Sequence, residues 1–134
     1  MVRRPIAALA CVLAFAGTVA AQRAPMETAK DVMLALTIPG SDAVFKAAGV
    51  PPANAADWVA LRREAAPLAE SADLLLTPKY AIDAAEWPKL AQAHLTAATA
   101  ALKAIDKKDA NALADASDAL YETCDNCHKR FMKK

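Results

Sequence analysis

Apolar residues recur every three or four positions along most of this chain, which is the spacing of helices that bury one face. Between residues 54 and 76 the apolar positions advance in steps of 3, 4, 3, 4 and 3, and a similar stripe runs from 86 to 108. The two stripes consist of Trp58, Leu61, Ala65, Leu68, Ala72 and Leu75, and of Ala91, Leu95, Ala98, Leu102 and Ile105. Both segments are predicted to be long amphipathic helices.

Two further helices are predicted, one on each side of this pair. Between residues 25 and 49 an apolar stripe is interrupted at Pro39, which lacks a backbone N–H. Ser41 is suited to capping a new helix, so we expect this helix to be kinked or broken near Pro39. The last helix begins at Asp109, and its apolar face contains Leu113, Ala116, Leu120, Cys124, Cys127 and Phe131.

Local signals at the helix ends agree with this division. Asn54, followed by Asp57, is close to a capping box, and Pro88 suits the first turn of the third helix. Four amphipathic helices with short connections predict an all-α fold, an antiparallel four-helix bundle, in one domain over residues 22–134. The many alanines at core positions fit either close helix packing or room for a large flat group, and the sequence leaves both open.

The first residues have the pattern of a secretory signal peptide. A basic segment at 1–5 precedes an apolar run at 6–16 and small residues that end at Ala21. The apolar run is shorter than the roughly 20 residues that cross a bilayer, so we expect cleavage after Ala21 rather than a membrane anchor. Loss of Arg3 and Arg4 changes the formal charge from +1 to −1. Nucleic-acid binding, which needs a basic face, is not predicted.

The strongest chemical signal is the run Cys124-Asp125-Asn126-Cys127-His128 near the C-terminus. A C-x-x-C-H run is the attachment signal for c-type haem. Two thiols three residues apart lie on one helical face and can each add to a porphyrin vinyl group, while the following imidazole can ligate the iron. Redox dithiols and half zinc sites share the C-x-x-C spacing, but the histidine and the secretion signal favour covalent haem c.

This motif and the apolar stripes together resemble the class II c-type cytochromes, which comprise cytochrome c-prime and its six-coordinate, low-spin relatives. The resemblance covers residues 22–134. Its most specific part is Cys124-x-x-Cys127-His128 followed by Lys129-Arg130-Phe131, and the segment Val32-Met33-Leu34 with Ile38-Pro39 is similar to the first helix of the low-spin branch. The resemblance implies one covalent haem in a bundle of the bacterial periplasm, with His128 as fifth iron ligand and Met33 as sixth. It also permits a homodimer through the first two helices.

The sixth iron ligand is the least determined part of this prediction. Met132 lies one turn from His128 on the same helix and cannot reach the opposite face of the haem. Met33 is the favoured ligand, Met26 is a weaker candidate, and a vacant position stays open. His94, at the margin of the third apolar stripe, is the other candidate, although an ordinary surface or hydrogen-bonded histidine is expected there.

The functional expectation is an electron-transfer protein rather than an enzyme, since no paired carboxylates or nucleophile constellation is found. Redox partner proteins are expected, and the sequence does not identify them. Methionine–histidine ligation would give a higher reduction potential than two histidines. The alternative is a five-coordinate haem protein that binds or senses a gas such as NO or CO, as cytochrome c-prime does.

Overall fold

The computed structural model describes residues 25–132, and the predicted signal peptide at 1–21 lies outside them. The chain forms α1 (Ala29–Val32), η1 (Met33–Thr37), α2 (Ile38–Gly49), α3 (Ala55–Leu75), η2 (Pro78–Tyr80), α4 (Trp87–Lys107) and α5 (Ala110–Phe131). The elements α1, η1 and α2 follow one another without a break, and we call them the N-terminal helix. None of the helices described is both long and apolar enough to cross a membrane.

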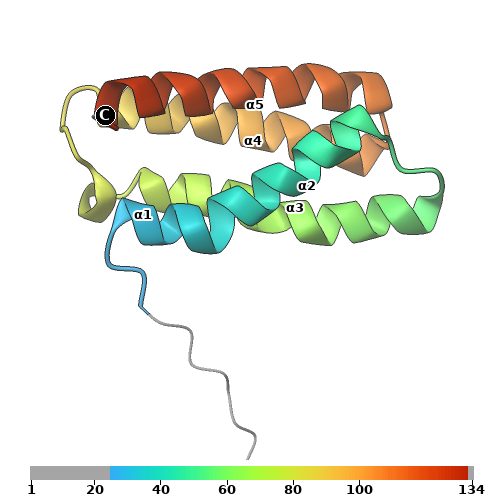
Figure 1. Ribbon diagram of the computed structural model, residues 1–134, viewed down its shortest axis with the longest axis horizontal. Coiled ribbons are helices and arrows are strands. Elements are labelled where there is room, and N and C mark those ends of the chain that lie inside the picture. The colour runs from blue at the N-terminus through green and yellow to red at the C-terminus, as the bar shows by residue number, and fades with distance from the viewer. Residues whose placement is uncertain (1–24, 133–134) are drawn as a thin grey trace, which may run out of the picture.

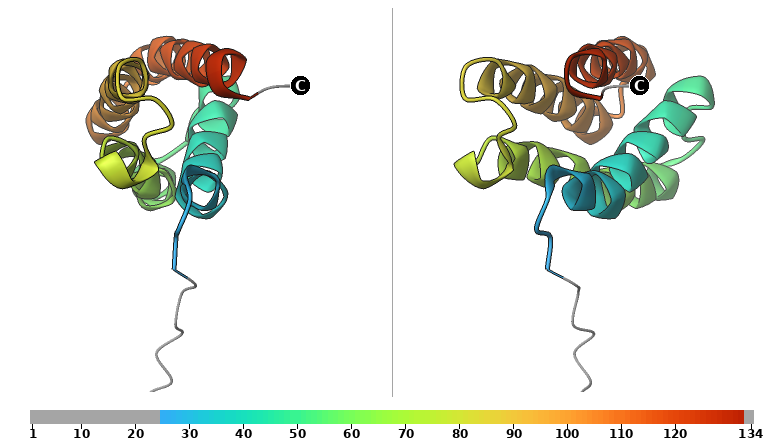
Figure 2. Two further views of the ribbon diagram at one scale, coloured as in Figure 1. Left: turned by 90° about the vertical axis from the view of Figure 1, so that its left-hand side faces the viewer. Right: turned by 60° about the vertical axis from the view of Figure 1, so that its left-hand side comes forward.

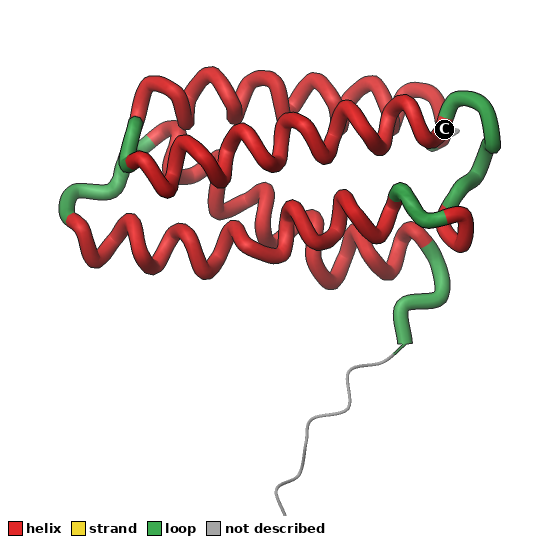
Figure 3. Tube along the Cα trace, turned by 180° about the vertical axis from the view of Figure 1, so that it is seen from behind, coloured by secondary structure: helices red, strands yellow, loops and turns green. Residues whose placement is uncertain are grey.

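The helices pack in chain order around a common axis. The N-terminal helix lies against α3, α3 against α4, and α4 against α5, while contacts of α2 with α5 close the bundle. Figure 1 shows the long helices running side by side, and the end views in Figure 2 show them surrounding the axis. Seen from behind, the tube trace contains helices and loops alone in the described part (Figure 3). The predicted all-α, antiparallel four-helix bundle is therefore confirmed.

Near Pro39 the sequence predicted a kinked or a broken helix, and the broken helix is wrong. The chain stays helical through Pro39, and the irregular turn is a π-helix one turn earlier, at Met33–Thr37. In this turn the N–H of Ile38 donates to the carbonyl of Met33, five residues back. A proline removes one donor and its ring crowds the preceding turn. The wider turn before Pro39 relieves that crowding without ending the helix.

The prediction that Ser41 caps a new helix is wrong, and the neighbouring Gly40 has a role in packing. Ser41 does not cap a new helix, because its hydroxyl donates to the carbonyl of Ile38 inside α2 at 3.1 Å. Gly40, inside α2, allows this helix to approach α3. A Cβ at residue 40 would lie 2.9 Å from both the Cβ and the N of Leu68. Gly40 is thus required by tertiary packing.

The other predicted helix ends agree with the structure. The Asn54 side chain accepts from the N–H groups of Ala56 and Asp57, and Asp109 caps α5 by accepting from the N–H of Ala112. Pro88 lies in the first turn of α4, as predicted. These contacts satisfy N–H groups that the helices leave without intrahelical partners.

The buried side chains form two clusters along the bundle axis. The larger, which we call the filled core, has Leu68, Ile105, Leu113 and Leu120 at its centre, surrounded by alanines of all four helices. The smaller lies at the end where α5 finishes and α1 begins, at the left of Figure 1, and we call this the C-terminal end of the bundle. Its buried members are Val32, Leu75, Tyr80, Trp87 and Ala91.

Candidate functional site

The four residues predicted to hold haem lie around cavities at the C-terminal end of the bundle. One cavity has a volume of about 210 Å³ and is lined by Met33, Cys124, Cys127 and His128. The second, of about 430 Å³, is lined by Met33, Cys127 and His128 but not by Cys124. Trp87 and Ile38 also line both cavities. Tertiary folding therefore brings Met33, nearly a hundred residues away in the chain, to the cavities of the C-x-x-C-H run.

Helix α5 positions the two cysteines and the histidine. Because α5 is continuous to Phe131, Cys124 and Cys127 lie on one face and His128 lies one turn after Cys124. Both thiols are free and half-buried, and His128 is exposed. Burial raises the pKa of the Cys124 thiol, and burial followed by the nearby Cys124 raises the pKa of Cys127. Both thiols are thus kept protonated at neutral pH.

The direction of the thiol pKa shifts bears on the meaning of C-x-x-C. A redox dithiol depends on a thiolate whose pKa is lowered by its surroundings, and zinc also binds thiolates. Here the shift has the opposite sign. Within residues 25–132, no group of three or more His, Cys, Asp and Glu side chains is arranged to hold a metal ion. The pKa shifts, and the arrangement of these side chains within the described residues, add no support for a dithiol enzyme or a zinc site.

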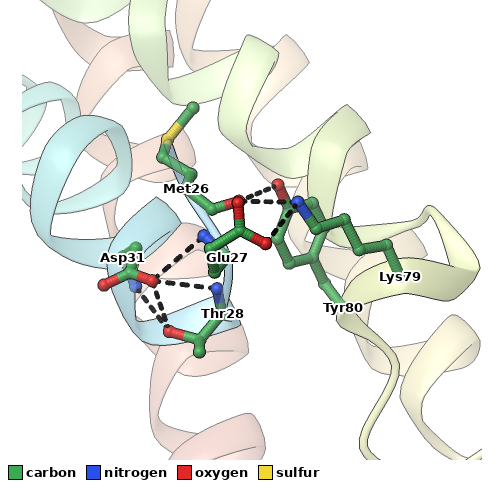
Figure 4. Close-up of polar contacts among 6 residues, drawn as sticks. All are labelled: Met26, Glu27, Thr28, Asp31, Lys79 and Tyr80. Atoms are coloured by element: carbon green, nitrogen blue, oxygen red, sulfur yellow. Dashed lines mark hydrogen bonds and ion pairs between the residues drawn. The ribbon is translucent and has the colours of Figure 1, made fainter. Parts of the chain in front are cut away.

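Met33 is positioned by the π-turn and by contacts that fix the start of the N-terminal helix. Figure 4 shows Tyr80 Oη and Lys79 Nζ both donating to the carbonyl of Met26, each at 2.9 Å. Beside them Thr28 and Asp31 form a capping box for α1. These contacts join η2 to the residues just before Met33, so the start of the segment that carries the thioether is held in place.

Two aromatic residues form a wall of the larger cavity. The rings of Trp87 and Phe131 lie 5.2 Å apart between centroids, and Trp87 Nε1 donates to the carbonyl of Leu75 at 2.6 Å. Arg130 pairs with Glu86 across the ends of α5 and α4. These contacts brace the C-terminal end around the cavities, because α3, α4 and α5 are tied together there.

His94 is more deeply buried than its predicted place at the margin of the third apolar stripe implies. It is 6 % exposed and lines the smaller cavity with Met33, Cys124 and His128. Its Nδ1 lies 3.3 Å from Thr123 Oγ1. Burial, followed by the nearby His128, lowers the pKa of His94, so its ring is neutral at pH 7. The expectation of a hydrogen-bonded histidine is confirmed, and the expectation of a marginal position is wrong.

The sequence did contain a signal for the position of His94. A stripe drawn from Trp87 rather than Ala91 advances in steps of 4, 3, 4, 3 and 4 through Ala91, His94, Ala98, Ala101 and Ile105, all of which are buried. Leu95 and Leu102, chosen for their size, are only half-buried. The small side chains of α4 are the ones that pack most closely in the bundle. A stripe drawn through the larger residues is therefore centred on the wrong part of the helix surface.

The residues at these cavities fit a covalent haem. Two thiols on one helical face can form the two thioether bonds, and an imidazole and a thioether are established axial ligands of haem iron. The surrounding side chains are predominantly apolar, with Trp87, Leu75 and Phe45 among them, and suit the face of a porphyrin. Met26, the weaker candidate for the sixth ligand, packs against the smaller buried cluster at the C-terminal end but lines neither cavity.

Comparison of the chain with protein-family models, with curated proteins and with solved structures found no match in any of the three.

Proposed function

We propose that this protein is a periplasmic electron-transfer cytochrome with one covalent haem c at the C-terminal end of the bundle. The observation that carries the proposal is the meeting of Met33 with Cys127 and His128 around the same two cavities. A thioether and an imidazole supplied by separate helices can bind the two faces of one iron. The haem iron would supply the chemistry, a one-electron change between the ferric and ferrous states.

Each residue has a defined role in this proposal. Cys124 and Cys127 anchor the porphyrin through thioether bonds, His128 binds the iron from α5, and Met33 binds it from the N-terminal helix. The contacts of Lys79 and Tyr80 with the Met26 carbonyl hold the Met33 segment in place during oxidation and reduction. Such bracing favours electron transfer, because the ligands then move little when the iron changes its oxidation state.

Covalent attachment is tested directly on the mature chain isolated from the periplasm. Acid-acetone extraction is expected to leave the haem with the protein, and the intact mass is expected to include the porphyrin. Cys124→Ser and Cys127→Ser should each leave the haem singly attached or absent. A colourless chain whose mass equals that of the polypeptide alone would contradict the proposal.

The optical spectrum then separates the carrier from the gas-binding alternative. A low-spin ferric spectrum with a methionine–iron charge-transfer band supports an electron carrier with Met33 bound. A high-spin ferric spectrum would instead support a five-coordinate protein that binds NO or CO. In both cases Cys124, Cys127 and His128 keep the same roles.

A further inference from the structure

The helical turn that begins at Met33 contains one residue more than a regular turn. In an α-helix each N–H donates to the carbonyl four residues earlier, so the N–H of Ile38 would donate to Leu34. Here it donates to the carbonyl of Met33, five residues back. The helix continues on both sides of this π-turn without a break. Single π-turns of this kind are rare and frequently lie at functional sites.

The extra residue changes which side chains share a face of the helix. In a regular helix a side chain lies on the same face as those three and four positions later. Met33 would then share a face with Leu36 and Thr37, and Leu36 lines neither cavity. Leu34 would share a face with Thr37 and Ile38, both of which line the smaller cavity. A regular helix therefore favours Leu34 at the smaller cavity.

The observed side chains follow the wider turn instead. Met33 is half-buried and lines both cavities. Leu34 is 59 % exposed and lines the larger cavity but not the smaller one. The smaller cavity is the one that Cys124 also lines. The difference matters chemically, because a thioether can bind haem iron and the hydrocarbon side chain of leucine cannot.

We propose that the π-turn selects the sixth iron ligand, by placing the thioether of Met33 at the smaller cavity where a regular helix would place Leu34. This role rests on the proposed function, since it needs the haem, whereas the hydrogen bonding of the turn is a property of the chain alone. The inference also connects the two candidate functions. With Leu34 at the smaller cavity the N-terminal helix would offer no ligand there, and the iron would be five-coordinate.

Exchanging the two neighbouring side chains tests the proposal without changing the chain length. In the double variant Met33→Leu with Leu34→Met, the methionine moves to a position that the π-turn keeps away from the smaller cavity. The ferric protein should therefore change from low spin to high spin and lose the methionine–iron charge-transfer band. Leu34→Met alone is the matched control and should keep the wild-type spectrum. A double variant that stays low-spin would overturn the proposal, because position 34 would then supply the ligand.

Deletion of Ala35, an exposed residue inside the turn, tests the same idea in the opposite direction. Without this residue a regular helix places Met33 three and four positions before Thr37 and Ile38, which are its neighbours in the π-turn. The low-spin spectrum and the reduction potential should therefore be retained. High-spin iron in a deletion variant that is folded by circular dichroism and urea unfolding would overturn the proposal. The exchange variant remains decisive if the deletion variant does not fold.

Nuclear magnetic resonance measures the turn itself, in the reduced protein or in the chain as purified if it carries no haem. A through-space contact is expected between the Hα of Met33 and the amide hydrogen of Ile38, five positions later. A regular series of contacts between residues three and four positions apart, without this one, would show an α-turn and overturn the proposal. A chain that shows the contact but contains no haem would refute the proposed function and leave the structure of the turn confirmed.

Discussion

The two ends of this bundle are built from the same four helices but differ in how the space between them is occupied. In the filled core, alanines such as Ala98 and Ala101 on α4 let the helices approach closely around Leu68 and Leu120. At the C-terminal end the same helices border partly open cavities of about 210 and 430 Å³. Protein interiors are normally packed as densely as organic crystals, so the hollow end needs an explanation.

The N-terminal helix accounts for the difference. Its second part, α2, packs on both α3 and α5, whereas α1 and η1 pack chiefly on α3. Figure 1 shows this helix inclined across the bundle, close to α5 at one end and close to α3 at the other. Gly40 lies where α2 meets Leu68 of α3, near the crossing of the two helices. The comparison indicates that one inclined helix can combine a solid core at one end with cavities at the other.

The largest expected effect comes from removing the predicted proximal ligand. His128→Ala should abolish normal haem assembly, and the chain should then be less stable, because the hollow end loses the group that it encloses. Leu120→Ala, in the filled core, should leave haem attachment unchanged. Haem content per chain, measured by pyridine haemochrome absorbance, checks both variants. A His128→Ala protein with full haem content and an unchanged spectrum would require another ligand.

The next effect concerns the distal face of the same end. Met33→Ala should convert low-spin iron to high-spin, lower the reduction potential and let the reduced protein bind carbon monoxide quickly, since the thioether no longer occupies the sixth position. Optical spectra and a redox titration measure these changes. Met26→Ala is the control, because Met26 lines neither cavity. Retention of the low-spin spectrum in Met33→Ala would remove Met33 from the ligand set.

A pair of leucine substitutions compares packing at the two ends directly. Leu120 is fully buried in the filled core, so Leu120→Ala should cost about 2–5 kcal/mol of unfolding free energy. Leu90 is half-buried and already borders a cavity, so Leu90→Ala creates little new void and should cost clearly less. Urea unfolding of both variants measures the difference. Equal costs would show that the C-terminal end is as tightly packed as the filled core.

The smallest expected effect is the pH dependence of the contacts that hold the Met33 segment. Hydrogen bonds from Thr28, first its side chain and then its backbone, lower the pKa of Asp31 below its ordinary value of 3.8. A carboxyl with a lowered pKa stabilises the fold above its unfolded pKa, and this contribution disappears as the pH falls below 3.8 toward the folded pKa. Asp31→Asn should therefore destabilise the chain slightly at neutral pH and flatten the loss of stability in acid. Unfolding measured from pH 6 down to pH 2.5 checks the slope, with Asp42→Asn, an exposed carboxyl on α2, as the control.

Much of the fold was determined by local signals in the sequence. Asn54, Asp109 and Pro88 act on backbone groups within three or four residues, so their effects on helix ends did not depend on the rest of the molecule. The apolar period similarly fixed the number and extent of the helices. The C-x-x-C-H run placed two thiols and an imidazole on one helix, because a regular helix positions neighbours at these spacings.

The tertiary structure decided which side chains meet across the bundle. The role of Gly40 was not predicted, because it lies in the close approach of Leu68, which is remote in sequence. His94 and Thr37 both line the smaller cavity. The sequence pattern did not predict this, because the inclination of the N-terminal helix determines which faces border that cavity. Local chemistry sets helices and their ends, whereas helix crossing depends on packing between residues far apart in the chain. The location of the cavities at the C-terminal end follows from that packing.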